Sequence, residues 1–235
     1  MQKLCQLIYS QVRLALFDMD GVLYDSMPNH ARAWHESMYS FGINMTELEA
    51  YRCEGMRGVE VIMQLARQQW GRAITESEAE EMYRAKSALY AGMPAPTFVS
   101  GIMDVHAALH HKGIHIGVVT GSGQGTLLSR LAHDFSATLT PGLIVSAHDV
   151  SRGKPAPDPY LQGICKASQL LGKEILPRQT IVIENAPLGV RSAVAAGCFT
   201  IAVNTGPLPD EVLRKEGAAM VLPDMKSLTA ALLSA

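Results

Sequence analysis

Several features that mark particular classes of protein are scarce or missing in this sequence of 235 residues. No basic block occurs among 20 Lys and Arg and 22 Asp and Glu, which argues against a nucleic-acid partner. No apolar run approaches the ~20 residues of a membrane span, and residues 4–9 are too few and too polar for a signal sequence. We therefore expect a globular protein without a membrane or nucleic-acid partner.

Cysteine is also scarce, and the spacing of the cysteines shows no CxxC pair or metal-ligand pattern. The four cysteines are Cys5, Cys53, Cys165 and Cys198. In a chain of this size they are typical of reduced thiols, which predicts a cytoplasmic location.

Apolar residues, in contrast, make up 48% of the sequence, and charged residues only 18%. Short aliphatic runs recur with helical stretches between them. Each run is apolar on both faces and is followed by a polar or Gly-rich turn, as in a parallel sheet that helices cover on both sides. The runs are 12–17, 115–119, 143–146, 181–183 and 199–203. This alternation predicts an α/β fold with a doubly wound, Rossmann-like parallel sheet.

Residues 28–99 break the alternation. This segment has no Asp but holds nine of the chain's thirteen Glu, and Glu is the better helix former. The expected helices are 28–41, 46–52, 58–70 and 76–91, and residues 92–96 look like a return linker. We therefore expect a core domain of residues 1–27 and 100–235, interrupted by an all-helical cap domain of residues 28–99.

Polar side chains and one glycine amide gather where the predicted strands end, apart from one Lys in a loop. They are Asp18, Asp20, Thr120, Gly121, Lys154, Glu184 and Asn185. Because ligands of open parallel sheets bind beyond the carboxyl ends of the strands, we expect these residues to form one site. Carboxylates held close together need a compensating cation, which predicts a hard divalent ion, Mg²⁺.

Four motifs in this order and spacing resemble those of the haloacid dehalogenase-like hydrolases. They are Asp-x-Asp-Gly-Val at 18–22, a strand ending in Thr at 120, Gly-Lys-Pro at 153–155 and Ile-Glu-Asn-Ala at 183–186. The insert after the first motif, with His-Ala-Arg-Ala-Trp at 30–34, resembles the β-phosphoglucomutase branch. Glu-Asn-Ala-Pro-Leu-Gly at 184–189 and Val-Thr-Gly-Ser-Gly-Gln at 119–124 are similar to members that hydrolyse inorganic pyrophosphate.

The resemblance implies a phosphohydrolase that works through an aspartyl-phosphate. Asp18 would be the nucleophile, and Asp20 would act as general acid and then as general base. Thr120, the Gly121 amide and Lys154 would bind the phosphoryl oxygens.

The resemblance also implies the metal ligands. Asp18, the backbone carbonyl of Asp20 and the side chain of Asn185 would hold Mg²⁺, with Glu184 completing or orienting this shell. The family most often has an acid where Asn185 stands, so weaker metal binding is expected; Asn185 could also cap the helix that follows it.

The cap indicates the substrate. Glu54 is expected to face the site, where its carboxylate could reach Mg²⁺ or close off the room for a sugar; a solvated Glu is the alternative. Mutases have a Ser-Arg pair after the Gly-Val of this loop, and here Glu60 and Val61 follow instead. Losing that Arg removes a clamp for a distal phosphate. We therefore expect a small phosphorylated substrate, inorganic pyrophosphate foremost, with β-phosphoglucomutase as the alternative.

A signalling receiver domain is an alternative outside the enzymes, because it too places an acidic cluster, a Thr and a Lys on a parallel sheet. Receivers lack a large helical insert after the first strand and an acid two residues beyond the phosphorylated Asp, which makes this alternative the weaker one.

A monomer or weak dimer is expected.

Overall fold

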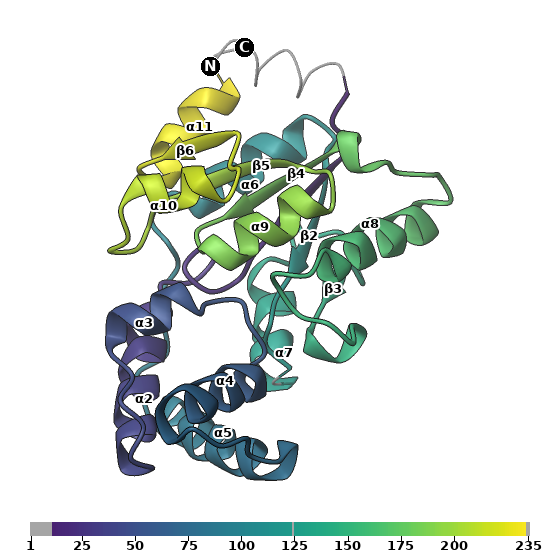
Figure 1. Cartoon of the computed structure of the whole chain (residues 1–235). Coiled ribbons are helices and arrows are strands. Elements are labelled where there is room, and N and C mark those ends of the chain that lie inside the picture. The colour runs from purple at the N-terminus through teal and green to yellow at the C-terminus, as the bar shows by residue number, and fades with distance from the viewer. Residues whose placement is uncertain (1–10, 124, 234–235) are drawn as a thin grey trace.

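The fold is built on a central parallel sheet (Figure 1). The computed structural model describes residues 11–123 and 125–233, so Cys5 and the segment 4–9 lie outside the described residues. Within these ranges the sheet has six strands in the order β3-β2-β1-β4-β5-β6. They are β1 Leu14–Phe17, β2 His115–Val119, β3 Ile144–Val145, β4 Thr180–Glu184, β5 Phe199–Val203 and β6 Met220–Leu222. The predicted parallel, Rossmann-like core is confirmed, and β6 is a strand that the sequence analysis missed.

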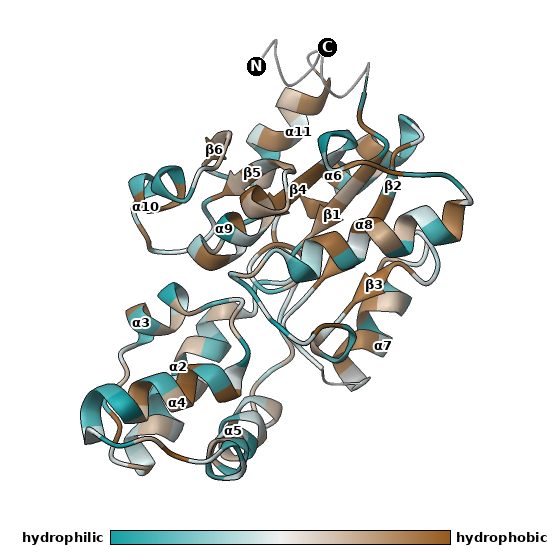
Figure 2. Ribbon diagram, turned by 45° about the vertical axis from the view of Figure 1, so that its right-hand side comes forward, coloured by the Kyte–Doolittle hydropathy of each residue, from teal (hydrophilic) through white to brown (hydrophobic). Residues whose placement is uncertain are grey.

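Helices cover both faces of the sheet (Figures 1 and 2). They are α6 Ile102–His111, α7 Gly125–Asp134, α8 Asp158–Leu171, α9 Pro187–Ala195, α10 Asp210–Lys215 and α11 Met225–Leu233. Successive residues of β1 point to opposite faces. Ala15 and Phe17 pack in one apolar cluster with residues of α6 and α11, while Leu14 and Leu16 pack in the other with Tyr160 of α8. This two-sided burial explains why the strands are apolar throughout.

The segment between β1 and β2 is helical. Its helices are α2 Met27–Ser40, α3 Glu47–Arg52, α4 Gly58–Trp70 and α5 Glu76–Ala91. Thr46 and Thr75 begin α3 and α5 with capping boxes completed by Glu49 and Glu78, which accounts for part of the Glu enrichment. The four helices enclose an apolar cluster of their own around residues such as Ile62.

The two chain segments that connect this helical part to the sheet lie side by side. An antiparallel bridge pairs Tyr24 with Phe98, and the Asp25 amide donates to the Thr97 carbonyl over 2.9 Å. Arg130 of α7 donates to the Pro96 carbonyl over 2.8 Å. The two covalent connections between the helical part and the core thus run through one short, paired region.

The three central strands, β2, β1 and β4, end at nearly the same height in the sheet because of their pairing register. Phe17 of β1 pairs with Val118 of β2 on one side and with Ile183 of β4 on the other. The polar residues that follow these positions therefore meet at one edge of the sheet.

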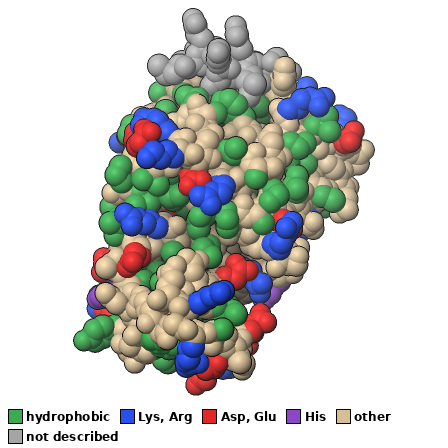
Figure 3. Space-filling view, in the orientation of Figure 1, with side chains coloured by type: hydrophobic (Ala, Val, Ile, Leu, Met, Phe, Trp, Pro, Cys, Tyr) green, Lys and Arg blue, Asp and Glu red, His purple; other side chains and the backbone are tan. Residues whose placement is uncertain are grey.

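On the face shown in Figure 3, acidic and basic side chains are interspersed and no broad basic patch forms. None of the described helices has both the length and the apolar character needed to cross a bilayer.

Candidate active site

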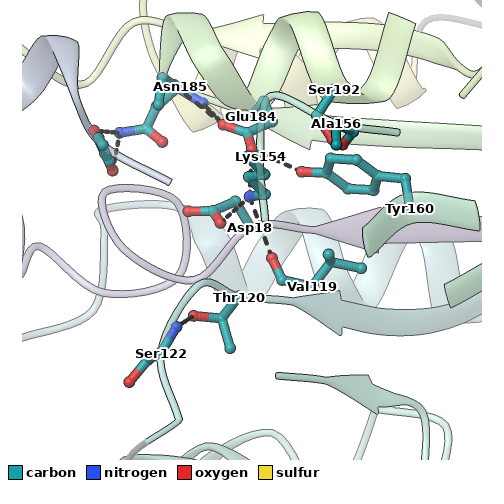
Figure 4. Close-up of polar contacts among 12 residues, drawn as sticks. Asp18, Val119, Thr120, Ser122, Lys154, Ala156, Tyr160, Glu184, Asn185 and Ser192 are labelled. Carbon is teal, nitrogen blue, oxygen red and sulfur yellow. Dashed lines mark hydrogen bonds and ion pairs between the residues drawn. The ribbon is translucent and has the colours of Figure 1, made fainter. Parts of the chain in front are cut away.

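The structure brings the predicted residues of the core together at the carboxyl edge of the sheet (Figure 4). Asp18 directly follows β1, Thr120 directly follows β2, and Glu184 is the last residue of β4. Lys154 comes from the loop before α8. All four side chains are buried, with exposed fractions between 0% and 4%. Thr120 Oγ1 accepts a hydrogen bond from the Ser122 amide over 3.0 Å, so its own proton remains available to a phosphoryl oxygen.

Lys154 lies between two carboxylates. Its Nζ donates to Asp18, to Glu184 Oε1 over 2.6 Å and to the Val119 carbonyl over 3.3 Å. Burial alone would lower the pKa of Lys154, but the charges of Asp18 and Glu184 raise it well above its usual value, so the ammonium form persists. Burial raises the pKa of Asp18 to about 7 against the opposing effect of Lys154. This cluster holds more negative than positive charge, which favours a further cation.

Glu184 is fully occupied by hydrogen bonds. Its Oε1 accepts from Lys154 and from the Tyr160 hydroxyl over 2.7 Å, while its Oε2 accepts from the backbone amides of Asn185 and Ala186 over 3.0 and 3.1 Å. Of the two roles expected for Glu184, these contacts favour orienting the site over binding the metal directly. The sequence analysis did not identify Tyr160.

Asn185 places a buried oxygen, without a partner in the described part of the chain, at this edge of the sheet. Its Nδ2 donates to Oε1 and Oε2 of Glu54 over 3.1 and 3.3 Å. Its Oδ1 is buried and, among the described residues, has no hydrogen-bond partner. Such an orphaned oxygen is costly unless a cation or another donor meets it. The helix α9 begins after Ala186 without a side-chain cap, so capping does not explain Asn185.

The donor set fits Mg²⁺. An amide oxygen, a buried carboxylate and a backbone carbonyl are hard oxygen ligands, as Mg²⁺ requires. Within the described ranges, no group of three or more His, Cys, Asp and Glu side chains is arranged to hold a metal. The candidate site therefore depends on Asp18 together with the carbonyl of Asp20 and the amide of Asn185.

Asp20 belongs to a chain of polar contacts that reaches into the cap. Its Oδ1 accepts from Ser26 Oγ over 2.6 Å and lies 3.2 Å from His30 Nε2. His30 Nδ1 lies 2.7 Å from Lys86 Nζ. Because a Lys ammonium can only donate, Nδ1 accepts and Nε2 carries the proton that faces Asp20. Burial would raise the pKa of Asp20, but His30 and Ser26 lower it to about 2, so the carboxylate is ionised.

Lys86 is a buried cation among aromatic rings, and the sequence analysis missed it. Its Nζ lies 5.1, 5.8 and 5.2 Å from the ring centroids of Trp34, Tyr83 and Tyr90. Burial lowers the pKa of Lys86 to about 8. The burial of Lys86 could have been predicted, because Lys86 continues the helical spacing of the buried residues Ala79, Met82 and Tyr90 in α5.

The loop between α3 and α4 lies directly on the core site. Glu54 is 9% exposed, and burial, followed by the charges of Asp18 and Glu184, raises its pKa well above the usual range. A Cβ added to Gly55 would meet Lys154 Cδ at 2.9 Å, so the loop backbone covers the Lys154 side chain. Gly121 lies against the same loop, since its added Cβ would be 3.1 Å from the Gly55 carbonyl oxygen.

A cavity of about 70 Å³ remains between the loop and the core. Lining residues that carry polar or aromatic side chains include Asp18, Asp20, Glu54, Trp34, Tyr83 and Lys86. Arg57 does not line it; its guanidinium group donates to the Ser151 carbonyl oxygen over 3.4 Å. No arginine of the described residues therefore lines this cavity.

A buried carboxyl group, a buried lysine and a helical insert at the carboxyl edge of a parallel sheet are typical of capped α/β phosphatases. The family model of the haloacid dehalogenase-like hydrolases matches residues 15–203, and the chain belongs to this family. It is an enzyme of the phosphatase type.

Relatives in sequence and structure agree with this family. The chain is 32% identical to hexitol phosphatase A of Escherichia coli, over 91% of this chain and 92% of that protein. It is 30% identical to the validoxylamine A 7'-phosphate phosphatase of Streptomyces hygroscopicus, over 82% and 86%. A structure from Bacteroides vulgatus, named a putative beta-phosphoglucomutase, has a TM-score of 0.86 and 43% identity and covers 95% of this chain and 90% of that one.

Proposed function

We propose that this protein is a Mg²⁺-dependent phosphohydrolase that works through a phosphorylated Asp18. The observation that carries the proposal is the placement of Asp18 beside Lys154, with the orphaned Oδ1 of Asn185 at the same sheet edge. When bound by Asp18, Asn185 and the Asp20 carbonyl, Mg²⁺ supplies positive charge that offsets the phosphoryl oxygens. Glu184 orients this site through its contact with Lys154.

The residues of the chain divide the reaction into two steps. An oxygen of Asp18 forms a bond to phosphorus while the bond to the leaving oxygen breaks. Asp20, which is ionised in the free protein, takes up a proton from solvent when substrate binds and gives it to that leaving oxygen. Water then attacks the phosphoryl group on Asp18, Asp20 takes a proton from this water, and phosphate is released. Thr120, the Gly121 amide and Lys154 hold the phosphoryl oxygens in place.

For the substrate, we infer a small phosphorylated compound, with inorganic pyrophosphate as the first candidate. A cavity of about 70 Å³, with the Glu54 carboxylate at Asn185, leaves little room for a sugar while the loop occupies this position. Glu60 and Val61 stand where mutases have a Ser-Arg pair, and no arginine of the described residues lines the cavity to clamp the distal phosphate of a sugar bisphosphate. Sugar and polyol phosphates are the second candidates, because the named relatives include a hexitol phosphatase.

Phosphate release by the purified protein with Mg²⁺ tests this proposal. Pyrophosphate is compared with a panel of hexitol and hexose phosphates, and a coupled assay follows conversion of β-glucose 1-phosphate to glucose 6-phosphate. We expect the highest kcat/KM for pyrophosphate. A higher value for one sugar phosphate would overturn the substrate assignment, while mutase turnover with little phosphate release would overturn hydrolysis. Glu54→Gln should lower the preference for pyrophosphate if the carboxylate contributes to it.

A further inference from the structure

Tyr160 is a buried residue that the two-step reaction leaves without a role. It lies in the first turn of α8 and is 0% exposed. Its hydroxyl donates to Glu184 Oε1 over 2.7 Å, and its ring centroid lies 5.1 Å from Lys154 Nζ (Figure 4). We propose that Tyr160 positions Lys154 for phosphoryl transfer by acting through Glu184, an inference that rests on the proposed function.

The need for such a residue comes from competition for the ammonium group. Lys154 Nζ contacts both Asp18 and Glu184, and both carboxylates are buried. Attraction between charges is strong where water is excluded. Glu184 therefore competes with Asp18, and with a phosphoryl group carried by Asp18, for the same ammonium group.

Tyr160 weakens that competition. Its hydroxyl and the amides of Asn185 and Ala186 give Glu184 donors besides Lys154. With these donors Glu184 is held in place when the ammonium group follows the phosphoryl oxygens. Helix α9 packs directly against the Glu184 carboxylate, because a Cβ added at Gly189 would collide with it.

Without the Tyr160 hydroxyl, Lys154 is the one side-chain donor among the described residues that still hydrogen-bonds to Oε1 of Glu184. The ammonium group is then held toward Glu184 and away from the reacting phosphoryl group. Partners that orient the charged groups of a site from behind commonly contribute about 10- to 100-fold to activity.

Tyr160→Phe tests the proposal, because it removes one oxygen and keeps the ring. We expect kcat to fall about tenfold or more, with KM and the Mg²⁺ concentration for half-maximal activity within about twofold of wild type. Thr180→Val is the matched control. The Thr180 hydroxyl is buried on β4 and donates to the Leu176 carbonyl over 3.2 Å, away from Lys154. It should lose stability to a similar degree while kcat is unchanged.

Two kinetic outcomes would overturn the proposal. If Tyr160→Phe retains the kcat of Thr180→Val, the hydroxyl has only a structural role. If saturating Mg²⁺ restores kcat to Tyr160→Phe, Glu184 acts on the metal and not on Lys154.

The proposed function is tested separately in the same series. A wild type that releases no phosphate from any compound of the panel would refute that function. Crystal structures of wild type and Tyr160→Phe then decide the positioning question without turnover. Lys154 Nζ displaced from Asp18 toward Glu184 supports the proposal, and an unchanged position overturns it.

Discussion

Replacing Asn185 by Asp should change stability in a way that depends on Mg²⁺. In the wild type, Nδ2 of Asn185 donates to both oxygens of Glu54, and both side chains are buried. Asp has no donor there, so Asn185→Asp loses a hydrogen bond to a buried carboxyl group, which costs about 1–3 kcal/mol. It also sets a second carboxylate beside one whose pKa burial already raises. Proton uptake by Glu54 limits this repulsion, and we expect a total loss of about 2–4 kcal/mol without metal.

Bound Mg²⁺ should recover most of this loss, because the new carboxylate is a charged ligand in place of a neutral one. Urea unfolding is measured with EDTA and with saturating Mg²⁺; thermal midpoints should move by about 2–4 °C per kcal/mol for a chain of this size. Asn204→Asp is the matched control, since the Asn204 amide also donates to a carboxylate, that of Asp210, over 2.7 Å. Its loss should be the same in both conditions. An equal loss for Asn185→Asp with and without Mg²⁺ would refute the ligand assignment.

Three further predictions concern the nucleophile, the cap and a buried histidine. Asp18→Asn should reduce phosphate release by at least about 10³-fold while circular dichroism stays native; retained activity would exclude the covalent step. Lys86→Met removes the donor to His30 and so loosens the partner of Asp20; kcat should fall about tenfold with a smaller change in KM, and an unchanged kcat would contradict this. Burial lowers the pKa of His106 to about 3, so the unfolded chain, but not the folded one, binds a proton below about pH 6.5. Stability should therefore fall by about 2 kcal/mol between pH 7 and 5 in urea titrations, and His106→Phe should remove this part; parallel curves for the two proteins would refute it.

Much of the fold could be predicted because local signals mark the elements. The helix at 58–70 ends where predicted, and it is followed by Gly71 in the left-handed conformation. Thr75 starts α5 through its capping box. The strand β6 was missed because it is short and half-buried at the sheet edge and therefore lacks a continuous apolar run.

The site residues that follow strands could be predicted from the sequence. The site residues that reach the site only through tertiary packing could not. The resemblance placed Asp18, Thr120 and Lys154, and strand pairing brings them together. Tyr160 and Lys86 make their contacts with residues 24 and 56 positions away, and no local pattern specifies such partners. The domain bounds at 28–99, the site roles, the cytoplasmic location and the monomeric or weakly dimeric state stay predictions.

The single paired attachment of the helical segment has a consequence for protein engineering. The insert encloses its own apolar cluster, and its two chain connections to the core lie beside the Tyr24–Phe98 bridge. It can therefore be exchanged as a cassette that keeps His30 and Glu54, which contact Asp20 and Asn185 of the core. A chimaera that keeps this bridge and receives the insert of a relative with another substrate would retain the strand pairing. This pairing brings Asp18, Thr120 and Glu184 to one edge of the sheet. Selectivity could then be redesigned by recombination, with the reacting groups left untouched.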